Sequence, residues 1–405
     1  MSVLLLQGPL GPFFKHLSDA FRKVGHSVHK INFNGGDTAY YQSDSINYQG
    51  QPKDWSHFLT DVIKDKSVSL VLAYGDCRFY HHEAKRICAN LGILYVALEE
   101  GYLRPNYITL EVGGVNGHSP IKHSGVEAYQ PMHTIHDEII IPNNFMKRIR
   151  YVIKYYVSRE LKHHQFRFYQ HHRTYSSFMD AVLWTRAYWR KHLYKWIEPT
   201  VKTLTKSHDF FLVPLQVHND AQIEFHSQYD SIEAFIKNVM ISFAQSKSAD
   251  RLIFKHHPMD RGHVLYTKYI KTLANELGIS NQVQYIHDQH LPTLLQACKG
   301  VVTINSTTAL QAFYHGAAVK VMGSAFYDMP GLTDQKSLEE FWHNPQKPDM
   351  EFADRFRGYL LYHGQINGSF YCLFRFTCEN IVRYMQEHGM LYSPQDLPGK
   401  ATWDK

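Results

Sequence analysis

The sequence lacks the features that mark several common classes of protein. Its 405 residues include only five cysteines, an odd number with no CxxC pair, so a disulfide framework is not expected. No apolar stretch approaches the roughly 18 residues of a membrane-spanning helix, and we expect none. The apolar residues 3–6 follow no basic residues and are too few for a signal peptide. These absences predict a reduced, cytoplasmic protein.

Motifs for metals and nucleotide cofactors are also missing. Histidine is abundant, with 27 residues, but neither an HExxH motif nor a Cys/His zinc spacing is present. The sequence has no Walker A motif, and its first glycine-rich turn does not match the dinucleotide fingerprint GxGxxG. We therefore predict that the protein binds no metal and uses no cofactor.

Charge is distributed unevenly along the chain. The net charge is +6, yet residues 146–196 hold twelve Lys or Arg against two acids, a net +10, which leaves −4 for the rest. This segment is also aromatic and helical in tendency. Because Lys, Arg, Trp and Tyr suit the headgroup region of a bilayer, it predicts docking on an anionic membrane. A solvated helical linker is the alternative; a nucleic-acid partner is not expected, because no recognised binding motif occurs.

Strands and helices alternate on both sides of this basic segment. Such alternation predicts parallel sheets with helices on both faces, an α/β fold. The expected strands are residues 3–7, 27–33, 68–74, 93–97, 210–215, 252–255, 283–286, 300–304 and 318–322. The expected helices are residues 13–24, 80–91, 232–245, 264–277, 292–297, 306–315 and 373–388.

Two Rossmann-like halves separated by a distinct segment suggest the GT-B glycosyltransferase fold, in which the domains face a cleft at the carboxyl ends of their strands. A kinase, a dehydrogenase or a binding protein could show the same alternation of strands and helices, so alternation alone does not exclude these functions. We predict an N-terminal acceptor domain, a basic membrane-docking segment, a C-terminal domain for a nucleotide-sugar, and a final helix and tail that pack back on the first domain. Their ranges are 1–145, 146–200, 201–375 and 376–405.

Two polar groups follow strands of the second half. Lys255-His256-His257-Pro258 places cationic and imidazole donors at a strand end, where they can bind a phosphate; the alternative is a surface loop. Asn305-Ser306-Thr307-Thr308 lies between a strand and a helix, where free N–H groups can attract a phosphate or where the hydroxyls only cap the helix. Because both groups fall at the carboxyl edge of one predicted sheet, they reinforce each other.

Carboxylates occur at two further strand ends. Glu99-Glu100-Gly101 could include a general base, and Arg104 is near enough in sequence to bias its pKa or to hold an anion. Gln216 and Asp220 follow the first strand of the second half, where Asp220 could act as a nucleophile. The alternative for Glu99-Glu100-Gly101 is a solvated acidic loop, and the alternative for Asp220 is that it only caps a following turn or helix.

Glycine turns follow the first two strands. Gly8 and Gly11 lie in the first turn, and Asn34 and Gly35 in the second. We interpret them as tight turns that let an acceptor approach the backbone, with a purely structural role as the alternative.

Seven motifs, in order over nearly the whole chain, resemble the capsule polysaccharide biosynthesis family, and within it the single-module β-Kdo transferase type. They are LLLQGPLGPFFKHL, GHSVHKINFNGGD, EEGYLRP, PLQVHNDAQI, FKHHPMDRG, NSTTALQAFYHG and QINGSFY. The basic segment is covered least.

The resemblance implies a retaining GT-B enzyme that transfers Kdo from CMP-Kdo to phosphatidylglycerol or lyso-phosphatidylglycerol. The product would start the oligo-Kdo linker of a capsular polysaccharide, at the cytoplasmic face of the inner membrane. A related two-module Kdo transferase and the capsule ABC transporter are then expected partners.

The resemblance also implies roles for residues. His257-Pro258 matches the HP motif that binds the CMP phosphate, and Glu100 matches the catalytic base, although relatives often have Asp there. Gln216 to Asp220 matches the Gln-x-x-x-Asp element. The Ser/Thr pair that holds the nucleotide is Ser306-Thr307 or Thr307-Thr308.

Retention of configuration requires either two inversions or attack on the same face. A covalent Kdo–Asp220 intermediate would give two inversions. Two rival functions remain open: transfer of another CMP-sugar such as sialic acid, and a non-catalytic scaffold for capsule export.

Overall fold

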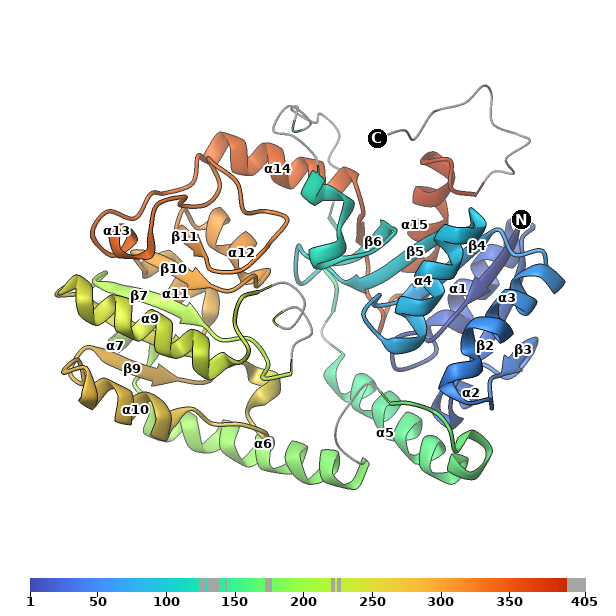
Figure 1. The fold of residues 1–405 in the computed structure, drawn as a ribbon, viewed down its shortest axis with the longest axis horizontal. Helices are drawn as coiled ribbons and strands as arrows, with labels where there is room; N and C mark the ends of the chain where they lie inside the picture. Colours follow the sequence, from blue (N-terminus) through green and yellow to red (C-terminus); the bar gives the residue numbers. More distant parts are fainter. Residues whose placement is uncertain are drawn as a thin grey trace. The chain divides into compact units, whose positions relative to one another are not determined.

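The computed structural model describes residues 1–123, 129, 138–142, 144–171, 177–219, 223 and 227–391 (Figure 1). The chain divides into two compact units, each with its own sheet. Unit 1 comprises Met1–Pro120, His133–Thr174 and Leu360–Lys405, and unit 2 comprises Ile121–Met132 and Tyr175–Tyr359. The predicted boundaries at residues 145, 200 and 375 stay predictions.

The sheet of unit 1 has seven strands in the order β12-β6-β5-β4-β1-β2-β3. Strands β1 to β5 are parallel, whereas β6 runs antiparallel to β5, and β12 antiparallel to β6. The expectation of a wholly parallel sheet is therefore wrong at this edge. The connection of residues 101–106 is too short for the crossover that a parallel neighbour needs. The strands are β1 (Ser2–Leu5), β2 (Ser27–Asn32), β3 (Ser45–Asn47), β4 (Leu70–Tyr74), β5 (Leu94–Glu100), β6 (Tyr107–Val112) and β12 (Gln365–Asn367).

Helices cover both faces of this sheet because its central strands are apolar on both sides. Val3 and Leu5 of β1 pack with α1 (Phe13–Lys23) and α15 (Phe374–Glu387). Leu4 belongs to the core formed with α3 (Trp55–Asp65) and α4 (Phe79–Leu91). The remaining helices of unit 1 are α2 (Gly35–Thr38), α5 (Phe145–Leu161) and the 3-10 turns Pro52–Asp54, Asn116–His118 and His163–Phe166.

Unit 2 has a five-stranded parallel sheet in the order β11-β10-β7-β8-β9. Its strands are β7 (Phe210–Pro214), β8 (Arg251–Lys255), β9 (Val283–Ile286), β10 (Gly300–Thr303) and β11 (Ala318–Val321). The helices within its described residues include α6 (Ser177–Ile197), α7 (Val201–Leu204), α9 (Ile232–Ser246), α10 (Thr267–Glu276), α11 (Leu291–Ala297), α12 (Thr308–Tyr314) and α13 (Leu338–His343), with a 3-10 turn at Pro258–Asp260. Two elements contain residues of both units, namely a 3-10 turn at Pro120–His123 and helix α14 (Met350–Tyr362).

Strand order reverses once in the middle of each sheet. The reversal lies between β1 and β4 in unit 1 and between β7 and β10 in unit 2. Ligands of doubly wound sheets bind outside the carboxyl ends of the strands at such a switch point. Two Rossmann-like units in one chain confirm the predicted α/β fold of the GT-B class.

The two helices of the basic segment fall in different units. Its first helix, α5, belongs to unit 1, and its second, α6, belongs to unit 2. Within the described residues, no helix is both long enough and apolar enough to cross a bilayer.

Candidate functional site

A hydrogen bond joins the two strands at the switch point of unit 1. Gln7 follows β1, Arg78 follows β4, and Arg78 Nη1 donates to Gln7 Oε1 at 3.0 Å. The Arg78 guanidinium also lies over the ring of Tyr74, with Cζ 5.2 Å from the ring centroid. The ends of β1 and β4 therefore hold a cation at the edge where a ligand is expected.

The amide of Gln7 continues this network into helix α5. Its Nε2 donates to the hydroxyls of Tyr155 and Tyr169 at 3.1 and 3.0 Å and lies 3.3 Å from Asp37 Oδ2. Tyr155 also accepts a hydrogen bond from Asn34 Nδ2 at 2.9 Å and donates to Asp37 Oδ1 at 3.3 Å. The side chain of Asn34 caps α2 as well, so this predicted acceptor residue also has a structural role.

The predicted glycines allow close approach of other parts of the chain. A Cβ atom at Gly35 would lie 2.2 Å from the Ser158 carbonyl oxygen of α5, and one at Gly11 would lie 3.2 Å from the ring of Tyr151. A Cβ atom at Gly8 would lie 2.8 Å from the ring of Phe14. These contacts account for the glycines without a ligand, and a role in acceptor binding stays a prediction.

The two acids expected at a strand end are the last two residues of β5. Glu99 Oε1 accepts a hydrogen bond from the Glu100 N–H at 3.0 Å, and Tyr74 donates to Glu100 Oε1 at 3.4 Å. Burial raises the pKa of Glu99, and the charge of Glu100 adds to this, while Arg78 and Arg104 oppose it. Arg104 turns its Nε toward the Gly101 carbonyl, at 3.2 Å. The pair thus offers one carboxyl that protonates easily beside a second carboxyl.

At the switch point of unit 2, two hydrogen bonds join Gln216 and Asn305. Gln216, after β7, donates from Nε2 to Asn305 Oδ1 at 3.0 Å, and Asn305 N–H donates to Gln216 Oε1 at 3.2 Å. Ser306 Oγ accepts from Thr308 N–H at 3.2 Å, so helix α12 begins at Thr308, with Thr307 at its N-cap. All five residues, including Ser306 and Thr307, lie at the carboxyl ends of β7 and β10.

The basic motif after β8 divides into a buried and an accessible half. Lys255 is buried, donates to the His287 carbonyl at 3.1 Å, and has its pKa lowered by burial. Burial also lowers the pKa of His256 to about 3, so this imidazole is neutral near pH 7. His257 is half-buried and Pro258 exposed, and His257 Nδ1 accepts from Met259 N–H at 3.2 Å. Of the four, His257 is therefore the residue best placed to contact a phosphate.

Two acids bind nitrogen-bearing side chains beside this motif. Asp260 accepts from His218 N–H at 2.8 Å and lies 2.5 Å from His218 Nδ1. Arg261 is paired with Asp288, and both side chains are largely buried. The predicted nucleophile Asp220 lies outside the described residues, and its role stays a prediction.

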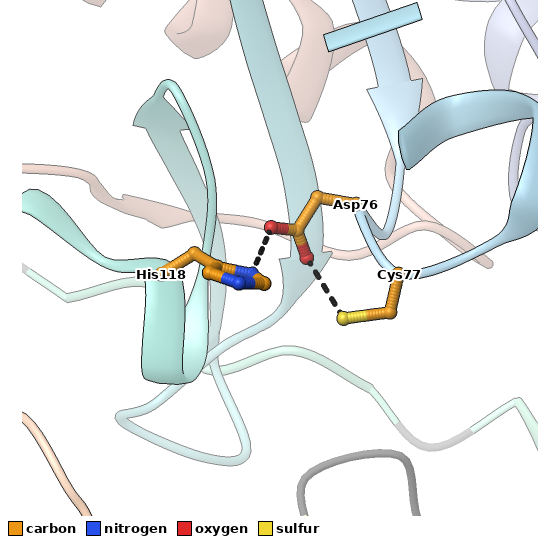
Figure 2. A group of neighbouring side chains, drawn as sticks. All are labelled: Asp76, Cys77 and His118. Atoms are coloured by element: carbon orange, nitrogen blue, oxygen red, sulfur yellow. Dashed lines mark hydrogen bonds and ion pairs between the residues drawn. The ribbon is translucent and has the colours of Figure 1, made fainter. Parts of the chain in front are cut away.

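A third polar group joins Asp76 and Cys77, which follow β4, with His118 of the 3-10 turn Asn116–His118 (Figure 2). Asp76 Oδ2 lies 2.9 Å from His118 Nδ1, and Cys77 donates to Asp76 Oδ1 at 3.5 Å. These ligand atoms lie within 4.8 Å of one another, a spacing that a metal ion could use. However, the Lys85 ammonium is 3.5 Å from the same Asp76 oxygen, and burial raises the pKa of Cys77 to about 12. We therefore interpret these three side chains as a hydrogen-bonded group that stabilises the loops on which they lie. The predicted lack of a metal stays a prediction.

Sequence reasoning missed Gln7, Arg78 and the tyrosines around them. The strand-end criterion that selected Glu99 and Glu100 applies equally to Arg78, which follows β4 by four residues. Tyr155 carried no comparable signal, because its contact with Gln7 joins positions 148 residues apart.

Comparison with known proteins bears on the whole chain. Residues 69–371 match the family described as "Capsule polysaccharide biosynthesis protein". The chain is 42% identical over 375 residues to "Capsule polysaccharide export protein KpsS" of Escherichia coli, covering 91% of this chain and 96% of that protein. It is 38% identical over 393 residues to "Capsule polysaccharide modification protein LipB" of Neisseria meningitidis serogroup A, covering 94% of each.

Among solved structures, KpsC of Thermosulfurimonas dismutans, a "beta Kdo 2,7 transferase", aligns with 96% of this chain and 100% of its own, at 15% identity and a TM-score of 0.49. The family match over most of the chain and the two similar relatives show that the chain belongs to the capsule polysaccharide biosynthesis family.

Proposed function

We propose that the protein is a retaining β-Kdo transferase that moves Kdo from CMP-Kdo to a phosphatidylglycerol-type lipid. The observation that carries the proposal is the combination of family membership over most of the chain with polar side chains at both switch points. The identity of the sugar comes from the motif resemblance described above.

The donor would bind to unit 2. CMP leaves as a phosphate monoester, so its departure is favoured by hydrogen-bond donors and positive charge at the phosphate. His257, the hydroxyls of Ser306 to Thr308 and the Gln216–Asn305 pair lie at the carboxyl ends of three adjacent strands, β8, β7 and β10. These residues can hold a nucleotide phosphate and ribose from neighbouring positions on one sheet edge.

The acceptor would bind to unit 1. Glu100 would take the proton from the acceptor hydroxyl, because it ends β5 beside Tyr74 at the expected sheet edge. Glu99 would support Glu100 through the hydrogen bond to its backbone N–H. In a double-inversion mechanism, Asp220 would form the bond to the Kdo anomeric carbon as CMP leaves, and the acceptor oxygen would then displace it.

Anionic membrane docking supplies the lipid acceptor in this proposal. Helix α6 is anchored in unit 2 through the buried residues Leu183, Ala187 and Tyr194. On its other face, exposed apolar residues recur, with Trp189 69% and Trp196 88% exposed, and Lys and Arg residues flank them. Large exposed aromatic side chains beside cations suit a headgroup interface at the cytoplasmic face of the inner membrane.

The decisive experiment is incubation of the protein with CMP-Kdo and lyso-phosphatidylglycerol, followed by mass spectrometry of lipid and protein. The proposal requires a lipid product with one added Kdo mass or more. CMP-sialic acid in a parallel reaction tests the rival donor, and its preferential use would overturn the proposal. CMP binding without turnover of any donor would favour the scaffold instead.

The same assay tests the nucleophile. Asp220→Asn should abolish transfer while leaving CMP affinity largely unchanged, and wild-type protein with donor alone should show a covalent Kdo adduct. Near-normal turnover by Asp220→Asn would exclude the double-inversion role of Asp220.

A further inference from the structure

Two arginines lie beside the predicted catalytic acid pair, each on the ring of a tyrosine. Arg78 lies over Tyr74, with Cζ 5.2 Å from the ring centroid, and Arg148 of α5 lies over Tyr371 at 4.2 Å. Both tyrosines are close to the acids. Tyr74 donates to Glu100 Oε1 at 3.4 Å, and the charge of Glu100 contributes to the raised pKa of Tyr371.

The two tyrosines also connect the arginines with each other. Burial raises the pKa of Tyr371 to about 12, and the negative charge of Glu100 contributes to this. Arg148 and the neighbouring Tyr74 hydroxyl act in the opposite direction and lower the pKa of Tyr371. Arg78, Tyr74, Tyr371 and Arg148 therefore form one continuous group on the same side of unit 1 as Glu100.

Neither arginine forms an ion pair with a carboxylate within the described part of the chain, although Arg78 is near enough to Glu99 to oppose the rise in its pKa. Arg78 donates one hydrogen bond, to the uncharged Gln7, and Arg148 is exposed on the second turn of α5. By contrast, Arg251 is paired with Asp209 and Arg261 with Asp288. Two positive charges held by neutral partners beside a predicted base are suited to an anionic ligand.

Helix α5 also presents an apolar surface away from this group. Four of its exposed apolar residues recur at helical spacing, Met146, Ile153, Val157 and Leu161. Its opposite side contacts the chain through Tyr151 and Tyr155. One helix thus carries both a surface for acyl chains and a cation beside the acid pair.

We propose that Arg78 and Arg148 bind the phosphodiester of the lipid acceptor and place its glycerol hydroxyl at Glu100. The inference rests on the proposed function for the identity of the acceptor. The reactive hydroxyl of a phosphatidylglycerol lies one glycerol unit from its phosphate, so the cations that hold the phosphate must lie near the base. The group of Arg78, Tyr74, Tyr371 and Arg148 meets that requirement.

The test measures binding without donor, so it does not depend on Kdo transfer. Titration of wild-type protein with soluble glycerophosphoglycerol should give saturable binding. Arg78→Gln and Arg148→Gln should each weaken it about tenfold or more, because each removes a charged hydrogen bond. Arg78→Lys and Arg148→Lys should recover part of the affinity, since they keep the charge but lose the planar fork. Arg150→Gln, the same charge change elsewhere on α5, should leave binding within about twofold.

A second readout separates recognition from folding. Wild-type protein should prefer lyso-phosphatidylglycerol to a monoacylglycerol, which offers glycerol hydroxyls and an acyl chain but no phosphate. The arginine variants should lose this preference while their Km for CMP-Kdo stays within about threefold.

Three outcomes would overturn the inference. They are an equal loss of affinity in Arg150→Gln, a rise in the donor Km as large as that for the acceptor, and equal competition by inorganic phosphate, which would indicate a general phosphate site. If the arginines determine headgroup binding but no sugar is transferred, this inference stands and the proposed function fails.

Discussion

Gln216 and Asn305 exchange two hydrogen bonds, at 3.0 and 3.2 Å, across the carboxyl ends of β7 and β10. The pair spans the switch point of unit 2 and uses both polar atoms of the Gln216 amide.

Replacing Gln216 should therefore weaken donor binding. Gln216→Met keeps the volume but removes both hydrogen bonds, and it should raise the Kd for CMP about tenfold, the effect of losing about 1–2 kcal/mol. Isothermal titration with CMP measures this. Gln245→Met, an exposed position in unit 2, is the matched control, and equal affinity in the two variants would contradict a donor role for the pair.

Glu100 and Glu99 should differ in their effect on turnover. Glu100→Gln removes the proposed base and should lower kcat by about 10²–10⁴ with little change in CMP affinity. Glu99→Gln keeps an oxygen that can accept from the Glu100 N–H, so its effect should be smaller. If Glu99→Gln proves the more damaging in steady-state assays, the base is Glu99 and the assignment must be exchanged.

The docking of α5 should depend on a single hydroxyl. Tyr155→Phe leaves Gln7, Asn34 and Asp37 without their shared partner, which should cost about 1–3 kcal/mol and speed amide hydrogen exchange in α5. Tyr156→Phe, one residue along the same helix, is the control. Unchanged exchange in Tyr155→Phe would show that packing alone holds the helix.

The outer face of α6 should determine membrane affinity. Trp189→Ser with Trp196→Ser should reduce binding to vesicles containing anionic lipid by at least about tenfold, because two large apolar surfaces no longer leave water. Tyr188→Ser, also exposed but farther around the helix, should have a smaller effect. Sedimentation with vesicles, at varied anionic lipid content and varied salt concentration, measures the affinity of each variant. Binding that changes with neither variable would contradict docking on an anionic surface.

Buried Glu111 on β6 should make stability depend on pH. Burial raises its pKa from 4.5 to about 8, so the folded chain keeps a proton that the unfolded chain loses between these values. The contribution of protonated Glu111 to the free energy of unfolding is complete below about pH 4.5 and is lost as the pH rises through about 8.

Glu111→Gln cannot ionise, so its Tm relative to wild type should rise between pH 5 and pH 8, by about 2–4 °C per kcal/mol. Thermal melts across that range measure the difference. Glu387→Gln, an exposed change of the same charge, should show no such trend. A parallel pH dependence in the two variants would mean that general charge, not burial, is responsible.

Local pattern predicted most of the architecture. Every predicted strand of the second half is present within two residues of its expected ends, because buried parallel strands are short apolar runs between turn residues. Strand β12 was not predicted, since it pairs with β6 across more than 250 residues and no local signal reports such a partner.

The candidate site was predicted unevenly for a similar reason. Strand ends identify where a side chain lies along a sheet edge, which is why Glu100 and Gln216 were found. They do not tell whether the side chain turns inward, as Lys255 does, or which distant side chain meets it, as Tyr155 meets Gln7. Those outcomes are decided by packing between elements far apart in sequence.

The hydroxyl of Tyr155 bonds to the amide of Gln7, and the same amide bonds to Arg78. A helix with an apolar outer face is thus joined to the arginine at the sheet edge through two side chains, Tyr155 and Gln7. Under the proposed function, a substitution that repacks α5 against the membrane would also shift the hydrogen bonds that orient Arg78. Preference for a membrane and preference for an acceptor would then have to change together in evolution.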